Sequence, residues 1–277
     1  STYVLLVDTE LPPGPKTNSR QYLKRGWCLM EYYASGIVKD SRCLISLSKL
    51  SGDETSWFYM CHKGKAGRAP PMAPAAFAVK LESGVATGEV GFTNKGDVPL
   101  VTGIYDTAFM TEMTKATELV YQCLGWDDAQ GVQLCEALRH AHAHGGLREL
   151  KRLYLGGNKL GDGFVTALVA LLDEGGLANV ETLDLASNAI SDAGMRELAA
   201  AVARGGLPKC TSLGLDGNPG SDAPVKEALV QRKLEQLQAC RPEILQAAEL
   251  SFSGAQWDDA QGVQLCEALR HAHGPGG

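Results

Sequence analysis

Three segments of the chain align without gaps at a spacing of 30 residues, and this repeat constrains the fold more than any other feature. Each segment carries the pattern L-x-x-L-x-L-x-x-N or a close variant of it. The aligned segments are 150–162, 180–192 and 210–222, which place Asn158, Asn188 and Asn218 in register. A fixed period of this length is typical of proteins built from stacked copies of one structural unit.

The residue types within each repeat predict a strand, a turn and a helix. Leu153 and Leu155 alternate with polar residues, as expected for a short strand with one face in a core. The asparagine that follows can satisfy backbone groups of a turn. An aspartate then stands where a helix N-cap is expected, and a Gly-Gly pair is expected to end each helix. The aspartates are Asp162, Asp192 and Asp222, and the glycine pairs begin at Gly145, Gly175 and Gly205.

One such unit cannot bury its own apolar face, so the units are expected to share a continuous core, with strands on the inside of a curved array and helices on the outside. The pattern resembles the leucine-rich repeats of the ribonuclease-inhibitor type over residues 117–229. The resemblance implies an α/β solenoid that acts by binding proteins.

A second, longer repeat copies a whole unit. WDDAQGVQLCEALRHAH from Trp126 recurs unchanged from Trp257, and the residues upstream of the two copies also match. These units lack the ordinary turn and resemble the atypical ends of repeat arrays. We expect the first copy to begin the array and the second to close it or to open another. The intervening residues 226–248 predict a polar helix interrupted at Pro242.

Residues 1–115 differ in texture and predict a small α/β layer. Residues 3–7 and 44–47 indicate strands, and residues 21–39 an amphipathic helix between them. Residues 63–74 are expected to form an exposed loop, and residues 101–118 a helix. The order of strand, helix and strand favours parallel pairing. The predicted division of the chain is therefore 1–115, 116–229 as the repeat array, and 230–277 as a helical spacer with the copied unit.

The string YLKRGWCLMEY carries two further resemblances. It is similar to the Trp-Cys-Leu-x-Glu helix of Toll/interleukin-receptor-like (TIR) domains, and also to an Arg-Gly-Trp-x-x-x-Glu domain that accompanies leucine-rich repeats in protists. The second also extends over RAPPMAPAAF and FTNKGD, whereas the first lacks the initial TIR strand and its loop. In TIR domains that hydrolyse NAD the matching glutamate is catalytic, which implies Glu31 here. The alternative is that Glu31 is a solvated helix residue beside a core Trp27, paired with Arg25.

Composition and other motifs narrow the function further. A net charge of −6 with scattered basic residues disfavours nucleic acid as a partner, and no apolar run is long enough to cross a membrane. Eight cysteines without a CxxC pair indicate neither a zinc site nor a disulfide framework, and favour the reducing cytoplasm. Because the first residue is Ser1, an organelle reached after removal of a leader, or a cut from a longer protein, is an alternative.

Histidines, cysteines and strand residues complete the set of candidate sites. His140 and His144 lie four residues apart and are weak candidates for a metal site, although a favourable interaction with a helix C-terminus explains them equally well. Cys135 is expected to be a buried apolar residue. No cofactor motif is present. The outward strand residues are the candidate protein-binding set: Arg152, Tyr154, Thr182, Asp184, Ser212 and Asp216.

Together these observations predict a non-enzymatic interaction or scaffold module that binds an unidentified protein partner. Arg152 and Tyr154 are the expected anchors, because arginine and aromatic residues dominate interface energetics. Two alternatives remain open. One is a TIR-related NAD hydrolase or signalling domain that uses Glu31, and the other is a structural accessory subunit of a large assembly.

Overall fold

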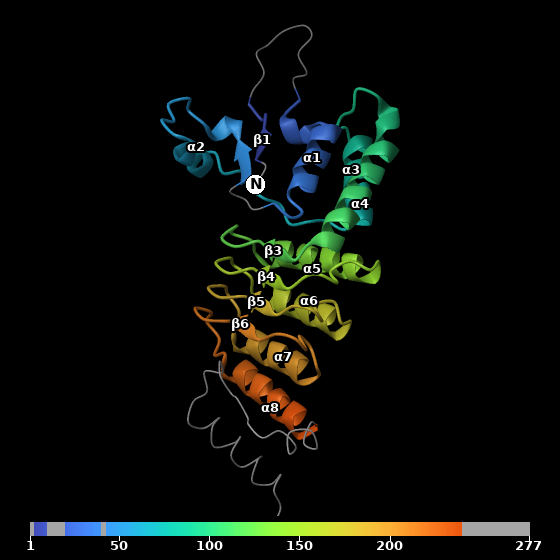
Figure 1. The fold of residues 1–277 in the computed structure, drawn as a ribbon. Helices are drawn as coiled ribbons and strands as arrows, with labels where there is room; N and C mark the ends of the chain where they lie inside the picture. Colours follow the sequence, from blue (N-terminus) through green and yellow to red (C-terminus); the bar gives the residue numbers. More distant parts are fainter. Residues whose placement is uncertain (1–2, 10–19, 40–42, 240–277) are drawn as a thin grey trace, which may run out of the picture.

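A computed structural model describes residues 3–9, 20–39 and 43–239 of the protein (Figure 1). Strands and helices alternate along much of the chain, and the α/β fold class is confirmed. In chain order the elements are β1 Val4–Leu6, α1 Gly26–Ser35, β2 Leu44–Ser46, α2 Trp57–Lys63, α3 Pro74–Ala86, α4 Val98–Lys115, β3 Glu118–Val120, α5 Asp128–Ala143, β4 Arg152–Tyr154, α6 Asp162–Asp173, β5 Thr182–Asp184, α7 Asp192–Ala203, β6 Ser212–Gly214 and α8 Ala223–Ala239. Short 3-10 helices span Tyr22–Lys24, Leu47–Lys49 and Lys95–Asp97.

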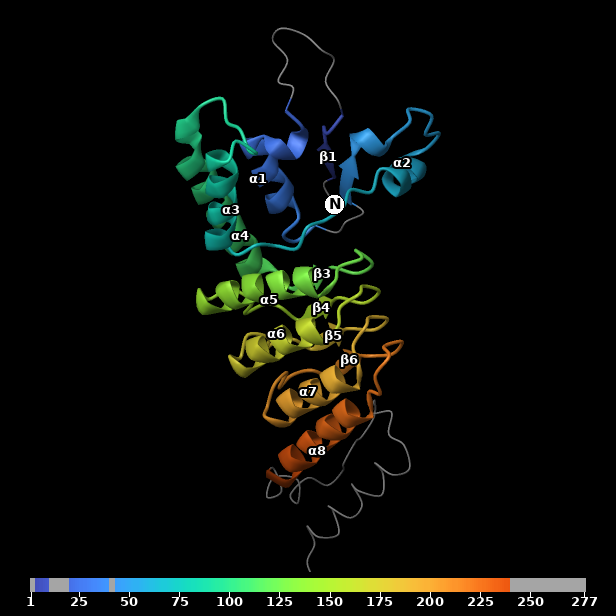
Figure 2. The ribbon, with the colours of Figure 1, turned by 180° about the vertical axis from the view of Figure 1, so that it is seen from behind.

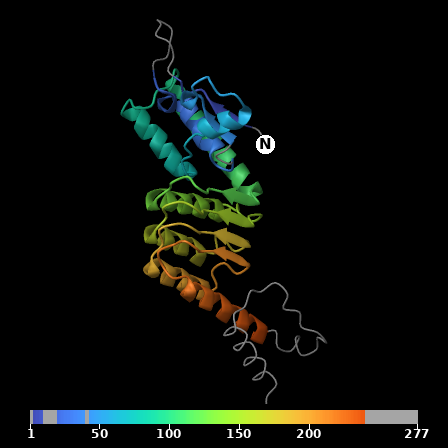
Figure 3. The same ribbon diagram turned by 90° about the vertical axis from the view of Figure 1, so that its left-hand side faces the viewer.

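The repeats form a stack of strand–helix units. Strands β3, β4, β5 and β6 pair in parallel in that order, and the register places Arg152 beside Thr182 and Thr182 beside Ser212. The predicted period of 30 residues is therefore the spacing between neighbouring strands. Seen from the side, the strands lie along one side of the stack and helices α5, α6 and α7 along the other (Figure 3). The copied unit from Trp126 begins this sheet, as predicted, whereas its second copy at 257–273 lies outside the described residues.

The aspartates predicted as N-caps occupy a different position in two of the three helices. The N-cap of α6 is Gly161 and that of α7 is Ser191, so that Asp162 and Asp192 are the first helical residues. Their carboxylates instead accept hydrogen bonds from the backbone of the following unit. Asp162 accepts from Ser191 N at 2.9 Å, and Asp192 from Ser221 N at 2.7 Å. The prediction failed because a sequence spacing cannot separate the last non-helical residue from the first helical one.

The Gly-Gly pairs end the helices as expected. Helices α5, α6 and α7 each end two residues before the first glycine of a pair. Gly145, Gly175 and Gly205 have φ angles of 83°, 78° and 101°. This left-handed conformation reverses the chain toward the next strand at little cost only when no Cβ is present.

The N-terminal residues form the predicted strand–helix–strand arrangement. Strand β1 pairs in parallel with β2, and Val4 lies beside Leu44. The expected helix over 21–39 is shorter, because α1 spans only Gly26–Ser35 and is preceded by a 3-10 turn. Helix α4 begins at Val98 rather than 101, with Pro99 in its first turn, where a missing N–H costs nothing. Its predicted last residue, Glu118, belongs to β3.

The segment 63–74 is irregular, as predicted, but much of it is not exposed. Pro70, Pro71 and Met72 are buried, and the Arg68 side chain is only 5% exposed. The prediction was wrong because the glycines, prolines and charges of this segment are typical of surface loops, whereas the N-terminal elements and the first repeat unit enclose it from both sides (Figure 2).

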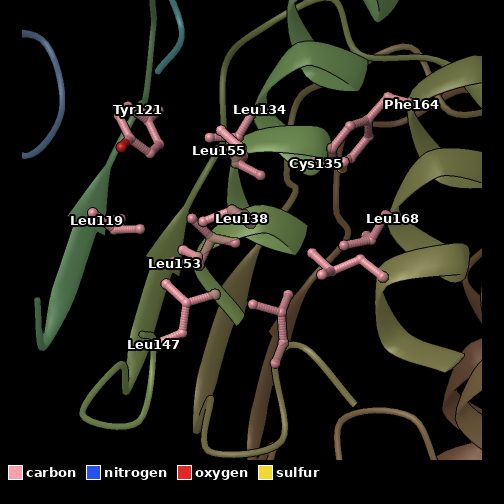
Figure 4. Packing of buried hydrophobic residues seen from close by; sticks show 14 of the residues in the cluster. Leu119, Tyr121, Leu134, Cys135, Leu138, Leu147, Leu153, Leu155, Phe164 and Leu168 are labelled. Carbon is pink, nitrogen blue, oxygen red and sulfur yellow. The ribbon is translucent and has the colours of Figure 1, made fainter. Parts of the chain in front are cut away.

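One apolar core runs through the repeats and into the N-terminal elements. Strand leucines and helix residues interdigitate, as Leu119, Leu153 and Leu155 do with Leu134 and Leu138 (Figure 4). The same cluster continues through α3 and α4 as far as Leu29 in α1. In the described part of the chain, no helix combines the length and the apolar character needed to traverse a lipid bilayer.

Candidate protein-binding surface

The outward side chains of strands β3 to β6 share one open face of the sheet, which we call the strand face. Within each unit the middle strand residue, such as Leu153 or Leu183, points into the core and is fully buried. The flanking residues point the other way and are exposed or half-buried. Two rows therefore cross the strand face: Glu118, Arg152, Thr182 and Ser212 in the first, and Val120, Tyr154, Asp184 and Gly214 in the second.

An exposed ion pair lies at the β3 end of the strand face. Arg152 Nε is 2.6 Å from Glu118 Oε2, across the β3–β4 pairing. The hydrogen bond and charge of Glu118 raise the pKa of Arg152 above its usual value. Glu118 is absent from the candidate set, because its unit is spaced 34 residues from the next and not 30. The pair fixes the guanidinium direction while leaving its other nitrogens directed to solvent.

Asp184 is held in the middle of the strand face between two glycines. Its carboxylate accepts from Gln122 Nε2 at 2.7 Å and from the Ala186 backbone N–H at 3.0 Å. A Cβ placed on Gly156 or Gly214 would lie 2.7 or 2.8 Å from the carboxylate oxygens. The neighbouring strands therefore leave room for this carboxylate only because they carry no side chain there.

The remaining predicted residue, Asp216, is exposed and follows β6. It aligns with Gly156 and Ala186 of the preceding units and not with Gly214. Its nearest cation is Lys226, which also forms an ion pair of 2.9 Å with Asp222, and the hydrogen bond from Asp222 raises the pKa of Lys226. The structure thus places all six predicted residues on or next to the strand face.

Comparison with known protein families identifies the unit on which this surface is built. Residues 176–199, which include β5 and the first two turns of α7, match the model of the family described as Leucine Rich repeat. These residues form a leucine-rich repeat. A search of curated proteins found no match.

The asparagines that define the leucine-rich repeat bridge neighbouring units. Asn188 Oδ1 accepts from Leu160 N at 3.1 Å, and its Nδ2 donates to Leu155 O and Leu185 O at 3.1 and 3.0 Å. Asn158 and Asn218 make corresponding bonds one unit before and one unit after. The ladder holds the strands in register, so that the rows of the strand face stay aligned.

Glu31 lies apart from the leucine-rich repeats, on α1. It is exposed and accepts a hydrogen bond of 3.2 Å from the Tyr22 hydroxyl. Burial, and then the Glu31 charge, raise the pKa of Tyr22. Trp27 is half-buried at the edge of the core and donates through Nε1 to Asp97 at 3.0 Å. Arg25 donates through Nε to the Arg20 carbonyl.

The two histidines considered for metal binding stack on each other at the end of α5. The ring centroids of His140 and His144 are 4.1 Å apart, and His144 Nδ1 lies 2.8 Å from the His140 carbonyl oxygen. Burial, followed by the charge of His144, lowers the pKa of His140. Among the described residues, no three histidine, cysteine or acidic side chains are grouped so that they could hold a metal ion. Cys135 is buried on the same helix, and burial raises the pKa of its thiol to about 12.

Proposed function

We propose that the protein is an interaction module whose strand face binds a protein partner, with Arg152 and Tyr154 as anchors. The observation that carries the proposal is the continuous open face on four parallel strands, where side chains from separate repeats lie in rows. Tyr154 and Arg152 occupy neighbouring positions on β4 and project from this face, while the leucine between them fills the core. Arginine and tyrosine are the residue types that contribute most to protein interfaces.

Specificity in this proposal comes from the carboxylates beside the anchors. The Glu118–Arg152 pair is internally compensated, whereas Asp184 and Asp216 add negative charge toward the β6 end of the strand face. A partner with basic side chains near an apolar or aromatic contact would complement this arrangement. We further propose that the units are of the ribonuclease-inhibitor type, that the partner is not a nucleic acid, and that the module works in the cytoplasm.

A pull-down tests the proposal directly. The bait is the full chain, and the test variant combines Arg152→Ala with Tyr154→Ala. We expect a partner recovered by the wild-type protein to be reduced by about tenfold or more, since two interface anchors together are worth roughly 1.4 kcal/mol or more. The matched control combines Arg196→Ala on the exposed side of α7 with Tyr59→Ala on α2, and it is expected to retain the partner.

Equal recovery of the partner by the wild-type and strand-face variants, or its selective loss from the control, would disprove the role of the strand face. A stable stoichiometric complex in the same experiment would favour the accessory-subunit form of this function. NAD hydrolysis through Glu31 stays a separate hypothesis. It requires cleavage of NAD by the purified protein that Glu31→Ala abolishes.

A further inference from the structure

The last strand of the repeat sheet has an outer edge without a partner among the described residues. In the preceding units Leu155 N donates to Asp184 O, and Leu185 N to Gly214 O, both at 2.8 Å. The corresponding donor in the last unit is Leu215 N, for which no described residue provides an acceptor. Gly217 N is in the same position, since Ser187 N donates to Asp216 O at 2.7 Å one unit earlier.

The core is also less complete beneath this edge. Leu119, Leu153 and Leu183 occupy the middle of the first three strands and are fully buried. Leu213 occupies the same position in β6 and is only half-buried. An exposed strand edge with partly uncovered apolar residues is a site at which another strand adds readily.

The chain itself contains a segment with the side chains that this edge needs. Residues 257–273 are identical to 126–142, and upstream of them Leu250 and Phe252 correspond to Leu119 and Tyr121. In the first copy these two strand residues are fully buried, and Asp128 of α5 accepts hydrogen bonds from backbone N–H groups of the adjacent unit. The second copy therefore carries the same core residues for a strand and a helix.

The length of the connection matches those within the sheet. Eight residues separate each helix from the next strand at 144–151, 174–181 and 204–211. Nine residues, 240–248, separate Ala239 of α8 from Glu249, the counterpart of the first residue of β3. The connection also contains Pro242, which cannot continue a helix.

We propose that residues 249–252 add to β6 as a fifth parallel strand, with Glu249 beside Ser212, and that residues 257–273 form the helix of this unit. The added strand supplies acceptors for Leu215 N and Gly217 N and covers Leu213. It also extends the strand face, because Glu249 and Ser251 continue the rows that contain Ser212 and Gly214. This assignment stands whether or not the strand face binds a partner.

Residue-resolved amide exchange of the full chain tests this assignment. In the wild-type protein we expect the Leu215 and Gly217 amides to exchange slowly. Leu250→Asp places a charge in the core of the added unit, and we expect it to accelerate exchange at both amides by about tenfold or more. The matched control is Ser251→Asp, which adds the same charge at an outward position and is expected to leave both rates within about twofold. The Leu155 and Leu185 amides report that the other units stay folded.

Two results would overturn the assignment. One is fast exchange at Leu215 and Gly217 in the wild-type protein, or the same rates in wild-type and Leu250→Asp. The other is protection that disappears on dilution, which would show that a second copy of the chain, and not the chain's own residues 249–252, covers β6.

Discussion

At the scale of single residues, the repeat depends on the amide of Asn188. This side chain is only 8% exposed and satisfies Leu160 N–H, Leu155 C=O and Leu185 C=O at once. No other residue type combines an acceptor and two donors on so short a side chain, which explains why the repeat places asparagine here. An apolar replacement leaves three buried backbone groups without partners.

We therefore expect Asn188→Ala to lower the free energy of unfolding by about 3 kcal/mol, since each buried polar group that loses its partner costs roughly 1–3 kcal/mol. Urea denaturation measures the change. The control is Asn179→Ala, whose hydrogen bonds with Arg148 O and Lys209 Nζ lie at the surface. It is expected to cost less than about 1 kcal/mol. Equal losses in the two variants would contradict a structural role for the ladder.

At the scale of elements, the helices are tied to one another by carboxylates at their first residues. Asp128 accepts from Gly163 N in the next unit, Asp162 from Ser191 N, and Asp192 from Ser221 N. Each carboxylate also lies at the positive end of its own helix dipole. The same row of side chains therefore stabilises a helix start and joins it to the following turn.

This arrangement predicts an acid-sensitive contribution from Asp162. Hydrogen bonds from the Ser191 hydroxyl and N–H lower the pKa of Asp162 below its ordinary value of 3.8. The unfolded chain binds the proton more tightly, so the stabilisation is present above pH 3.8 and is lost as the pH falls through the lower folded-state pKa. We expect Asp162→Asn to reduce the drop in melting temperature between pH 5 and pH 3.

Melting curves of the wild-type protein and of Asp162→Asn over this pH range measure the effect. Ser191→Ala removes one of the donors to the same carboxylate, and it should also flatten the pH dependence, though less. Parallel pH profiles for wild-type and Asp162→Asn would show that the carboxylate contributes nothing specific.

At the scale of the whole molecule, Arg68 joins the N-terminal elements to the repeats. Its guanidinium donates to Gly36 O at 2.7 Å and Ile37 O at 3.2 Å on one side, and to Val120 O at 2.7 Å on the other. It also stacks 4.3 Å above the Tyr121 ring. The Arg68 carbonyl accepts from Trp126 Nε1 at 2.8 Å. A single side chain thus links α1 to β3 through a buried polar contact.

Because the apolar core is continuous across this junction, we expect one cooperative unfolding transition for the wild-type protein. Arg68→Met leaves three carbonyl groups without their donor and is expected to cost about 3 kcal/mol or more, or to split the transition in two. Differential scanning calorimetry distinguishes these outcomes. Arg204→Met removes an exposed ion pair with Asp173 and is expected to cost at most about 1 kcal/mol. An unchanged transition in Arg68→Met would exclude the proposed coupling.

Much of the strand face could be predicted from the sequence, because a fixed period aligns equivalent residues whatever their identity. The row that contains Arg152 and Thr182 follows from the spacing alone. Glu118 and Gln122 could not be placed, since the first unit has a different length and departs from the pattern. The environment of Asp184 also depends on the absence of side chains at Gly156 and Gly214, which lie on neighbouring strands.

The sequence by itself determined the units and their order, because apolar alternation, turn asparagines and glycine pairs act over a few neighbouring residues and recur in each copy. Only the tertiary structure decided how the ends of this array are completed. Arg68 and the prolines near it carry a loop-like sequence signal, yet they are buried, because α1 and β3, both distant along the chain, provide partners for their polar groups. Such contacts occur once in the molecule, so no repetition in the sequence reveals them.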